Sequence, residues 1–67
     1  MLKNTLKVQR AIKDITQDQL AKQLGVSRQT VNSIEKSRYV PSTLLALKLS
    51  AYFRVTVNEL FELEEDD

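Results

Sequence analysis

The chain is 67 residues long, is 42% hydrophobic and 28% charged, and carries a formal net charge of +1, so we expect one small globular domain. It contains no Cys, no His and a single Gly, which excludes disulfides, thiol or imidazole catalysis, the usual zinc ligands and glycine-rich phosphate loops. We therefore expect no enzyme and no cofactor or metal. No run approaches the roughly 20 apolar residues that span a bilayer, and the first residues lack the pattern of a secretion signal. We expect a soluble, cytoplasmic protein with no membrane partner and no small-molecule ligand.

Apolar residues recur at intervals of three to four along almost the whole sequence, which is the period of an α-helix. This spacing predicts an all-α fold with five helices and no internal repeat. The predicted helices cover residues 4–13, 17–24, 28–36, 43–53 and 57–61.

Each predicted helix after the first begins at a hydroxyl side chain, which can accept a hydrogen bond from the free amides of the first turn. Gly25 ends the second helix, because a residue without a Cβ adopts positive φ at little cost. Pro41 marks a connector before the fourth helix. The predicted caps are Thr16, Ser27, Ser42 and Thr56, of which the first and last are followed by Gln19 and Glu59 at the spacing of a capping box.

The small net charge conceals two oppositely charged segments. Residues 1–54 hold ten basic and three acidic side chains, a net charge of +7, whereas residues 55–67 hold six acidic and no basic side chains, a net charge of −6. A basic body attracts polyanions, nucleic acid first. The acidic tail, residues 62–67, is not expected to fold alone, although Leu2 and the alternation over residues 61–64 could pair as a small two-stranded sheet.

Residues 17–36 resemble the helix-turn-helix of the XRE family, which contains transcriptional regulators of the phage repressor and Cro (Cro/C1) type. Ala21 occupies the fifth position of the motif, where the recognition helix crosses too closely for a larger side chain. Gly25 occupies the ninth position, a turn that needs positive φ. The apolar positions that lock the two helices together are filled by Leu20, Leu24, Val26, Val31 and Ile34. The resemblance covers nearly the whole chain and implies double-stranded DNA as the partner.

A helix-turn-helix also occurs in bundles that never contact DNA, so the outward face of the predicted third helix carries the functional prediction. That face has no acid and no large apolar group, and its side chains suit the edges of bases in the major groove. By the resemblance, the expected base-reading residues are Arg28, Gln29, Thr30, Asn32 and Ser33. The expected phosphate-binding residues are Thr16, Gln17, Ser27, Lys36, Arg38, Tyr39, Ser42 and Thr43. Capping explains Thr16 equally well, and solubility is the other interpretation of the Lys and Arg residues.

Arg10 and Glu35 match positions where proteins of this type commonly pair an Arg of the first helix with a Glu that ends the recognition helix. The resemblance therefore implies a largely buried salt bridge that fixes helix angles without touching DNA. Ser37 and Arg54 stand where relatives often carry Gly. Either these two residues adopt positive φ at roughly 1 kcal/mol each, or the turns differ.

Operators of this family are usually two-fold symmetric, because a symmetric dimer presents two recognition helices to half-sites about 34 Å apart. The predicted core takes Leu20, Leu24, Val31, Ile34, Leu45, Leu49 and Phe53. The remaining apolar residues Val57, Leu60, Phe61 and Leu63 are then the candidate dimer contacts, with Leu44 and Leu47 in reserve. Several of these could instead complete the monomer core.

The resemblance implies a homodimeric repressor that blocks transcription at an inverted-repeat operator. The alternative is an antitoxin or another protein-interaction module. In that alternative DNA binding serves autoregulation, and the acidic tail is the partner surface.

Overall fold

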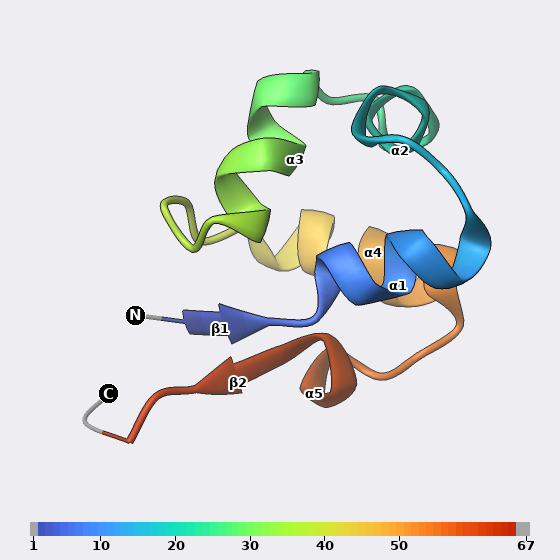
Figure 1. Cartoon of the computed structure of the whole chain (residues 1–67). Coiled ribbons are helices and arrows are strands. Elements are labelled where there is room, and N and C mark those ends of the chain that lie inside the picture. Colours follow the sequence, from blue (N-terminus) through green and yellow to red (C-terminus); the bar gives the residue numbers. More distant parts are fainter. Residues whose placement is uncertain (1, 66–67) are drawn as a thin grey trace.

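The computed structural model of the chain describes residues 2–65, and Figure 1 shows the path of the backbone. Within this part of the chain, two short strands at the ends enclose five helices, which confirms the predicted five-helix fold with a small sheet. The elements are β1 (Leu2–Asn4), α1 (Leu6–Lys13), α2 (Gln17–Leu24), α3 (Arg28–Glu35), α4 (Thr43–Phe53), α5 (Val57–Leu60) and β2 (Phe61–Leu63). Across residues 2–65, every helix is too short or too polar to cross a membrane.

The starts of α2 to α5 lie where the sequence predicts them, each behind a Ser or Thr cap. Thr16 Oγ1 accepts a hydrogen bond from the Gln19 amide at 3.0 Å, and Gln19 Oε1 accepts one from the Thr16 amide at 2.8 Å. The same reciprocal box forms between Thr56 and Glu59. Each such cap contributes about 1 kcal/mol to stability, so local chemistry fixes where these helices begin. The two remaining caps are Ser27 and Ser42.

Four helices end with the same turn, in which one residue adopts positive φ and the next amide donates to the carbonyl five residues earlier. The sequence left two possibilities at Ser37 and Arg54, and both residues have positive φ, at 58° and 56°. Asp14, with a φ of 54°, follows the same pattern, although the sequence did not predict positive φ there. The closing hydrogen bonds run from Ile15 to Arg10, Val26 to Ala21, Arg38 to Ser33 and Val55 to Ser50.

The first helix is two residues shorter than predicted, because Asn4 belongs to β1 and α1 begins at Leu6. Asn4 Oδ1 accepts a hydrogen bond from the Leu6 amide at 3.1 Å, and Asn4 Nδ2 donates to the Ile34 carbonyl at 2.8 Å. Asn4 therefore provides a hydrogen-bond acceptor for a free amide in the first turn of α1, and it also connects β1 to α3.

The acidic tail is partly ordered, because β1 supplies a partner for it. β1 and β2 pair antiparallel with Leu2 opposite Leu63 and Asn4 opposite Phe61. This pairing confirms the small sheet that the sequence allows for residues 61–64, with Glu62 and Leu63 folding against β1 and not alone, and the predicted fifth helix ends at Leu60, one residue early. Asp66 and Asp67, the last residues of the predicted tail, lie outside the described residues.

One core joins all five helices. α2 and α3 lie at one end of the molecule, α5 and the sheet lie at the other, and α1 and α4 pass between them (Figure 1). All seven predicted core residues are buried. Leu60 was predicted as a dimer contact, but its side chain is 0% exposed. It packs from α5 into the core and therefore cannot contribute to a dimer surface. The buried residues are Leu6, Leu20, Ala21, Leu24, Val31, Ile34, Leu45, Leu49, Phe53 and Leu60.

Candidate nucleic-acid interface

The turn between α2 and α3 sets the position of α3. Ala21 is only 1% exposed, so it permits the close approach of the two helices. Gly25 has a φ of 73°, and a Cβ added there would meet no atom within 4 Å. Glycine is therefore favoured by backbone conformation and not by lack of space. Val26 follows and packs against the core, so α3 lies in close contact with α2.

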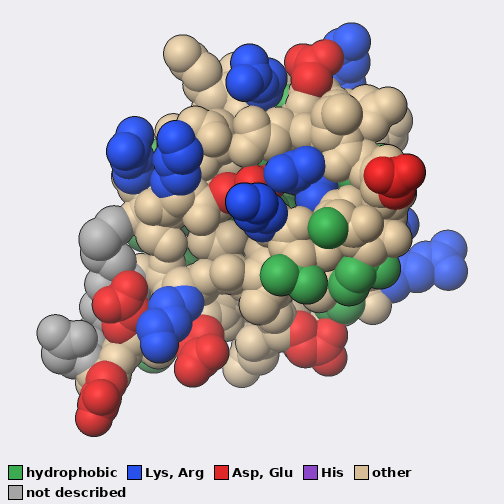
Figure 2. All heavy atoms as spheres, viewed as in Figure 1, with side chains coloured by type: hydrophobic (Ala, Val, Ile, Leu, Met, Phe, Trp, Pro, Cys, Tyr) green, Lys and Arg blue, Asp and Glu red, His purple; other side chains and the backbone are tan. Residues whose placement is uncertain are grey.

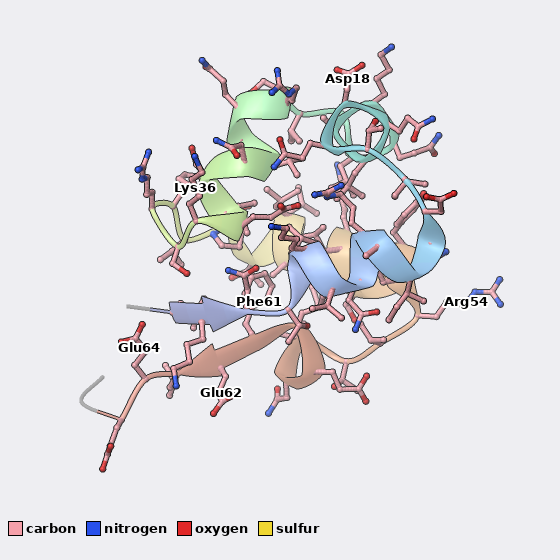
Figure 3. The ribbon with its side chains drawn as sticks, viewed as in Figure 1. Asp18, Lys36, Arg54, Phe61, Glu62 and Glu64 are labelled. Atoms are coloured by element: carbon pink, nitrogen blue, oxygen red, sulfur yellow. The ribbon has the colours of Figure 1, made fainter. Side chains whose placement is uncertain are left out.

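The face of α3 opposite the core is accessible. Val31 and Ile34 point into the core, and the helical spacing i, i+4, i+7 then places Gln29, Ser33 and Lys36 on the outward side. Figure 3 shows Lys36 at the end of α3 that lies farther from α2. The predicted base-reading residues all lie on this helix: Arg28 and Gln29 are exposed, and Thr30, Asn32 and Ser33 are half-buried.

On one side of this outward face, α3 and the loop that follows it surround a hollow of about 340 Å³. Ser33 and Arg38 line it together, although the predicted role of the first is base reading and that of the second is phosphate binding. Tyr39, 47% exposed, also lines a neighbouring hollow that reaches Ser42 at the start of α4. The fold therefore gathers four predicted phosphate-binding residues beside α3, namely Ser27, Arg38, Tyr39 and Ser42.

Thr43 does not join this group. Its side chain is exposed and lines a separate, apolar groove on the far side of the start of α4. Ser27 is occupied as a cap, since its hydroxyl accepts from the Thr30 amide at 3.1 Å and lies 2.9 Å from the Thr30 hydroxyl. Thr16 is likewise engaged with Gln19.

On the other side of the outward face, the start of α2 is tied to α3. Gln17 Nε2 donates hydrogen bonds to Asn32 Oδ1 at 3.1 Å and to Glu35 Oε1 at 3.2 Å. Sequence reasoning assigned Gln17 to a phosphate and missed both contacts. A signal was present, because Gln17 lies three and seven residues before the buried Leu20 and Leu24 and so shares their side of α2.

Arg10 and Glu35 form the ion pair that the resemblance implies. Arg10 Nε lies 2.7 Å from Glu35 Oε2, with side-chain exposures of 17% and 6%, and a second guanidinium nitrogen donates to Glu35 Oε1 at 3.2 Å. The hydrogen bonds with Glu35 raise the pKa of Arg10, against the opposing effect of burial. A third contact, from Arg10 to the Ile15 carbonyl at 2.9 Å, joins the pair to the start of α2.

Charge is distributed unevenly over the molecule. Arg28, Lys36 and Arg38 lie on α3 and the loop after it, where the nearby acid, Glu35, is paired with Arg10. Figure 2 shows basic side chains along this edge and acidic side chains gathered around β2 at the other end. The α3 edge can therefore attract a polyanion, while the acidic end faces away from it.

An apolar groove of about 740 Å³ lies at the α5 end of the molecule. Val57 and Phe61 line it and are half-buried, whereas Leu47 and Leu63 remain 55% and 69% exposed. The groove thus brings together three of the four predicted dimer residues, all except Leu60. It also includes one reserve, Leu47; the other reserve, Leu44, is 64% exposed and lines the hollow beside Tyr39.

Comparisons with known proteins agree with this geometry. The sequence profile of a family described as Helix-turn-helix matches residues 6–60. An uncharacterized HTH-type transcriptional regulator of Methanocaldococcus jannaschii is 48% identical over 66 residues, which cover 98% of this chain and 100% of the relative. A second uncharacterized HTH-type transcriptional regulator, from Bacillus subtilis, is 46% identical over the same shares of the two chains.

A solved structure extends the similarity to three dimensions. It is a crystal structure of a Bacteroides fragilis protein described as a candidate DNA-binding protein, with a TM-score of 0.81 and 29% sequence identity, and the match covers 92% of this chain and 100% of that one. The profile, the relatives and the fold therefore agree on one kind of protein, a DNA-binding regulator and not an enzyme. This chain belongs to the XRE-type helix-turn-helix family of transcriptional regulators.

Proposed function

We propose that the protein is a homodimeric repressor, which binds an inverted-repeat operator with α3 of each copy in the major groove. The observation that carries this proposal is the outward face of α3, which is accessible, free of acidic side chains and flanked by Arg28, Lys36 and Arg38. Ordinary solvated helices mix acids with bases, whereas this helix offers donors and acceptors that match base edges.

Within this proposal, α3 reads sequence. Arg28 donates to guanine, Gln29 pairs with adenine, and the Thr30 methyl group meets a thymine methyl. Asn32 and Ser33 lie at the margin of the same surface. Each good pairing is worth about 1 to 3 kcal/mol of discrimination against the wrong base.

Phosphate contacts hold α3 in register on both sides of the groove. Lys36, Arg38 and Tyr39 follow α3 directly and grip one strand. Ser27 and Ser42 add hydroxyls on that side, and Thr43, whose side chain lines the apolar groove, adds only its helix-start amide. Thr16 and Gln17 open α2 across the groove, where the positive end of a helix dipole favours an anion.

The apolar groove supports a two-fold dimer. Leu47 and Leu63 are large apolar side chains that remain mostly exposed to solvent, and Val57 and Phe61 extend the same apolar surface. One copy measures 33 by 22 by 21 Å, which is comparable with the spacing of roughly 34 Å between half-sites one DNA turn apart that the dimer has to match. Sedimentation equilibrium tests this step: a mass that stays at 7.7 kDa at every concentration would contradict it.

Repression then follows from occupancy, since a dimer covering promoter DNA excludes RNA polymerase. The protein then acts in the cytoplasm, which contains the DNA of bacterial and archaeal cells such as those of its relatives.

The decisive experiment is selection of bound duplexes from a random pool at about 150 mM salt, where non-specific attraction is weakened by counterion release. We expect enrichment of an inverted repeat whose half-site centres are about 10 to 11 base pairs apart. Enrichment of a single unrepeated half-site would contradict the dimer. No enrichment would contradict sequence-specific binding altogether.

A further inference from the structure

A continuous chain of side chains runs from α1 to the outward side of α3. Arg10 on α1 donates to Glu35 at the end of α3, and Glu35 also accepts from Gln17 at the start of α2. Gln17 in turn donates to Asn32, one turn before Glu35 on α3. The ion pair in the interior is therefore connected by hydrogen bonds to a side chain on the predicted base-reading helix.

The donor and acceptor inventory gives this chain a fixed direction. A guanidinium can only donate and a carboxylate can only accept, so Arg10 and Glu35 leave no choice at their end. Gln17 must then turn its NH₂ group, and not its carbonyl, toward Glu35. The second N–H of that group points to Asn32 and requires an acceptor there. The Asn32 carbonyl oxygen occupies that position at 3.1 Å, which leaves the Asn32 NH₂ group facing away from Gln17.

We propose that the Arg10 and Glu35 ion pair acts through Gln17 to hold the Asn32 amide with its NH₂ group outward, so that Asn32 reads a hydrogen-bond acceptor on a base. This inference rests on the proposed function, because it assumes that α3 enters the major groove. Guanine offers O6 and N7 there, thymine offers O4 and adenine offers N7 beside its N6 donor, whereas cytosine offers only the donor N4. Asn32 therefore selects guanine or thymine over cytosine at one position of each half-site.

Without Gln17 the selection disappears. A free asparagine amide can rotate by half a turn and present either its donor or its acceptor, so it accepts any base at similar cost. Gln17 is thus a positioning residue for specificity, and because both N–H groups of its side chain are used within the protein, any phosphate contact falls to its backbone amide. A single neutral hydrogen bond sets the size of the effect, a preference of about three- to tenfold.

The first test uses the free protein and needs no DNA. Exchange of side-chain NH₂ protons with water, followed by NMR, should be at least several-fold slower for Gln17 than for Gln23, which is exposed on the same helix. Equal rates for the two glutamines would overturn the inference, and the proposed function would be untouched by that result.

The second test measures base preference. Gln17→Met keeps the length of the side chain and removes the amide, so duplex selection should show the preference at the Asn32 position reduced to about one, with the other positions unchanged. Asn32→Ala should have the same effect, and the double variant should add nothing to it. Gln23→Met is the matched control and should leave every position unchanged. A uniform loss of affinity with an unchanged base profile would overturn the inference.

If thermal melting shows that Gln17→Met does not fold, a third variant still tests the inference. Asn32→Asp still accepts from Gln17 but presents only acceptors outward, so the preference should reverse toward cytosine. An Asp variant that still selects guanine or thymine would overturn the inference. If the unmodified protein selects no sequence while Gln17 exchange is slow, the proposed function itself has failed, and the reading role of Asn32 falls with it.

Discussion

The two ends of the molecule expose opposite kinds of surface. On the outward face of α3 the exposed side chains are polar or basic and lie over a buried apolar layer of Val31 and Ile34. At the α5 end, apolar side chains such as Leu63 remain exposed beside acidic neighbours. The polar and basic surface suits a charged, hydrated partner, and the apolar surface suits an interface from which water is excluded. One small domain can thus separate the proposed DNA-binding end from the proposed dimerisation end.

The difference extends to the way each end is held together. The α3 end is fixed by directional contacts, since the Arg10 pair and Gln17 connect three helices. The α5 end is fixed by the buried Leu60, by three residue pairs of sheet and by hydrogen bonds from Thr5 to backbone carbonyls of α5. Substitutions at the two ends should therefore have different effects, which makes the comparison testable.

The largest effect is expected at the ion pair. Arg10→Ala strands the Glu35 carboxylate, whose side chain is 6% exposed, and should lower the free energy of unfolding by about 3 to 5 kcal/mol. At about 4 to 8 °C per kcal/mol for a domain of this size, the melting temperature should fall by more than about 10 °C. Lys7→Ala, exposed on the same helix, should change stability by less than about 0.5 kcal/mol. An Arg10→Ala protein that melts within a degree or two of the parent would contradict a structural role for the pair.

The next effect separates two leucines three residues apart. Leu60→Ala should cost about 2 to 5 kcal/mol in urea unfolding, because it opens a cavity in the core. Leu63→Ala, at a residue 69% exposed, should cost less than about 1 kcal/mol in the monomer but should weaken dimerisation in sedimentation equilibrium. Equal losses of stability for the two variants would show that Leu63 belongs to the monomer core, and the dimer surface would have to be sought elsewhere.

A smaller and more selective effect is expected on α3. Arg28→Ala should cost about 1 to 3 kcal/mol of binding to the selected operator and should relax specificity at one position. Arg38→Ala should weaken binding to all sequences alike and reduce the salt dependence by about one charge. Binding isotherms at several salt concentrations, on operator and scrambled duplexes, distinguish the two. If both variants behave like Arg38→Ala, then Arg28 contacts phosphate and does not read a base.

The smallest effect is a gain. Arg54 holds a φ of 56° at the end of α4, and Arg54→Gly should raise stability by about 0.5 to 1 kcal/mol, because glycine adopts this conformation without strain. The greater freedom of glycine in the unfolded chain offsets part of the gain. Lys48→Gly, in the middle of the same helix, should instead lose about 1 kcal/mol. A loss at Arg54 as well would mean that its side chain contributes more than its backbone strain costs.

Most of the helical framework could be predicted because its signals are local. A Thr or Ser three residues before a free amide marks the start of each helix from α2 to α5 wherever the rest of the chain lies, and apolar side chains at helical spacing identify the core. The same spacing could not decide whether Leu60 and Leu63 face the core or the solvent. That choice depends on where α5 meets β2, and so on the pairing of the two chain ends.

The candidate site divides in the same way. The residue types on α3 follow from the sequence and the resemblance, but the contact of Gln17 with Asn32 and Glu35 joins residues 15 and 18 positions apart. The spacing of Gln17 from Leu20 and Leu24 indicates which side of α2 it lies on, but no local pattern specifies the residues of α3 that it contacts. The left-handed residue Asp14 escaped prediction for a related reason, since an aspartate signals this conformation more weakly than glycine does.

By itself, the sequence determined where the four later helices start, which side chains of α2, α3 and α4 form the core and which helix carries an acid-free outer face, because these properties depend on residues within one or two turns of each other. Only the tertiary structure decided that Asn4 and Phe61 leave the helices to form a sheet, that Leu60 is buried while Leu63 is not, and that Gln17 joins the ion pair to α3. The physical reason is that strand pairing, burial and side-chain hydrogen bonds between helices need partners that are distant in the chain and adjacent only after folding.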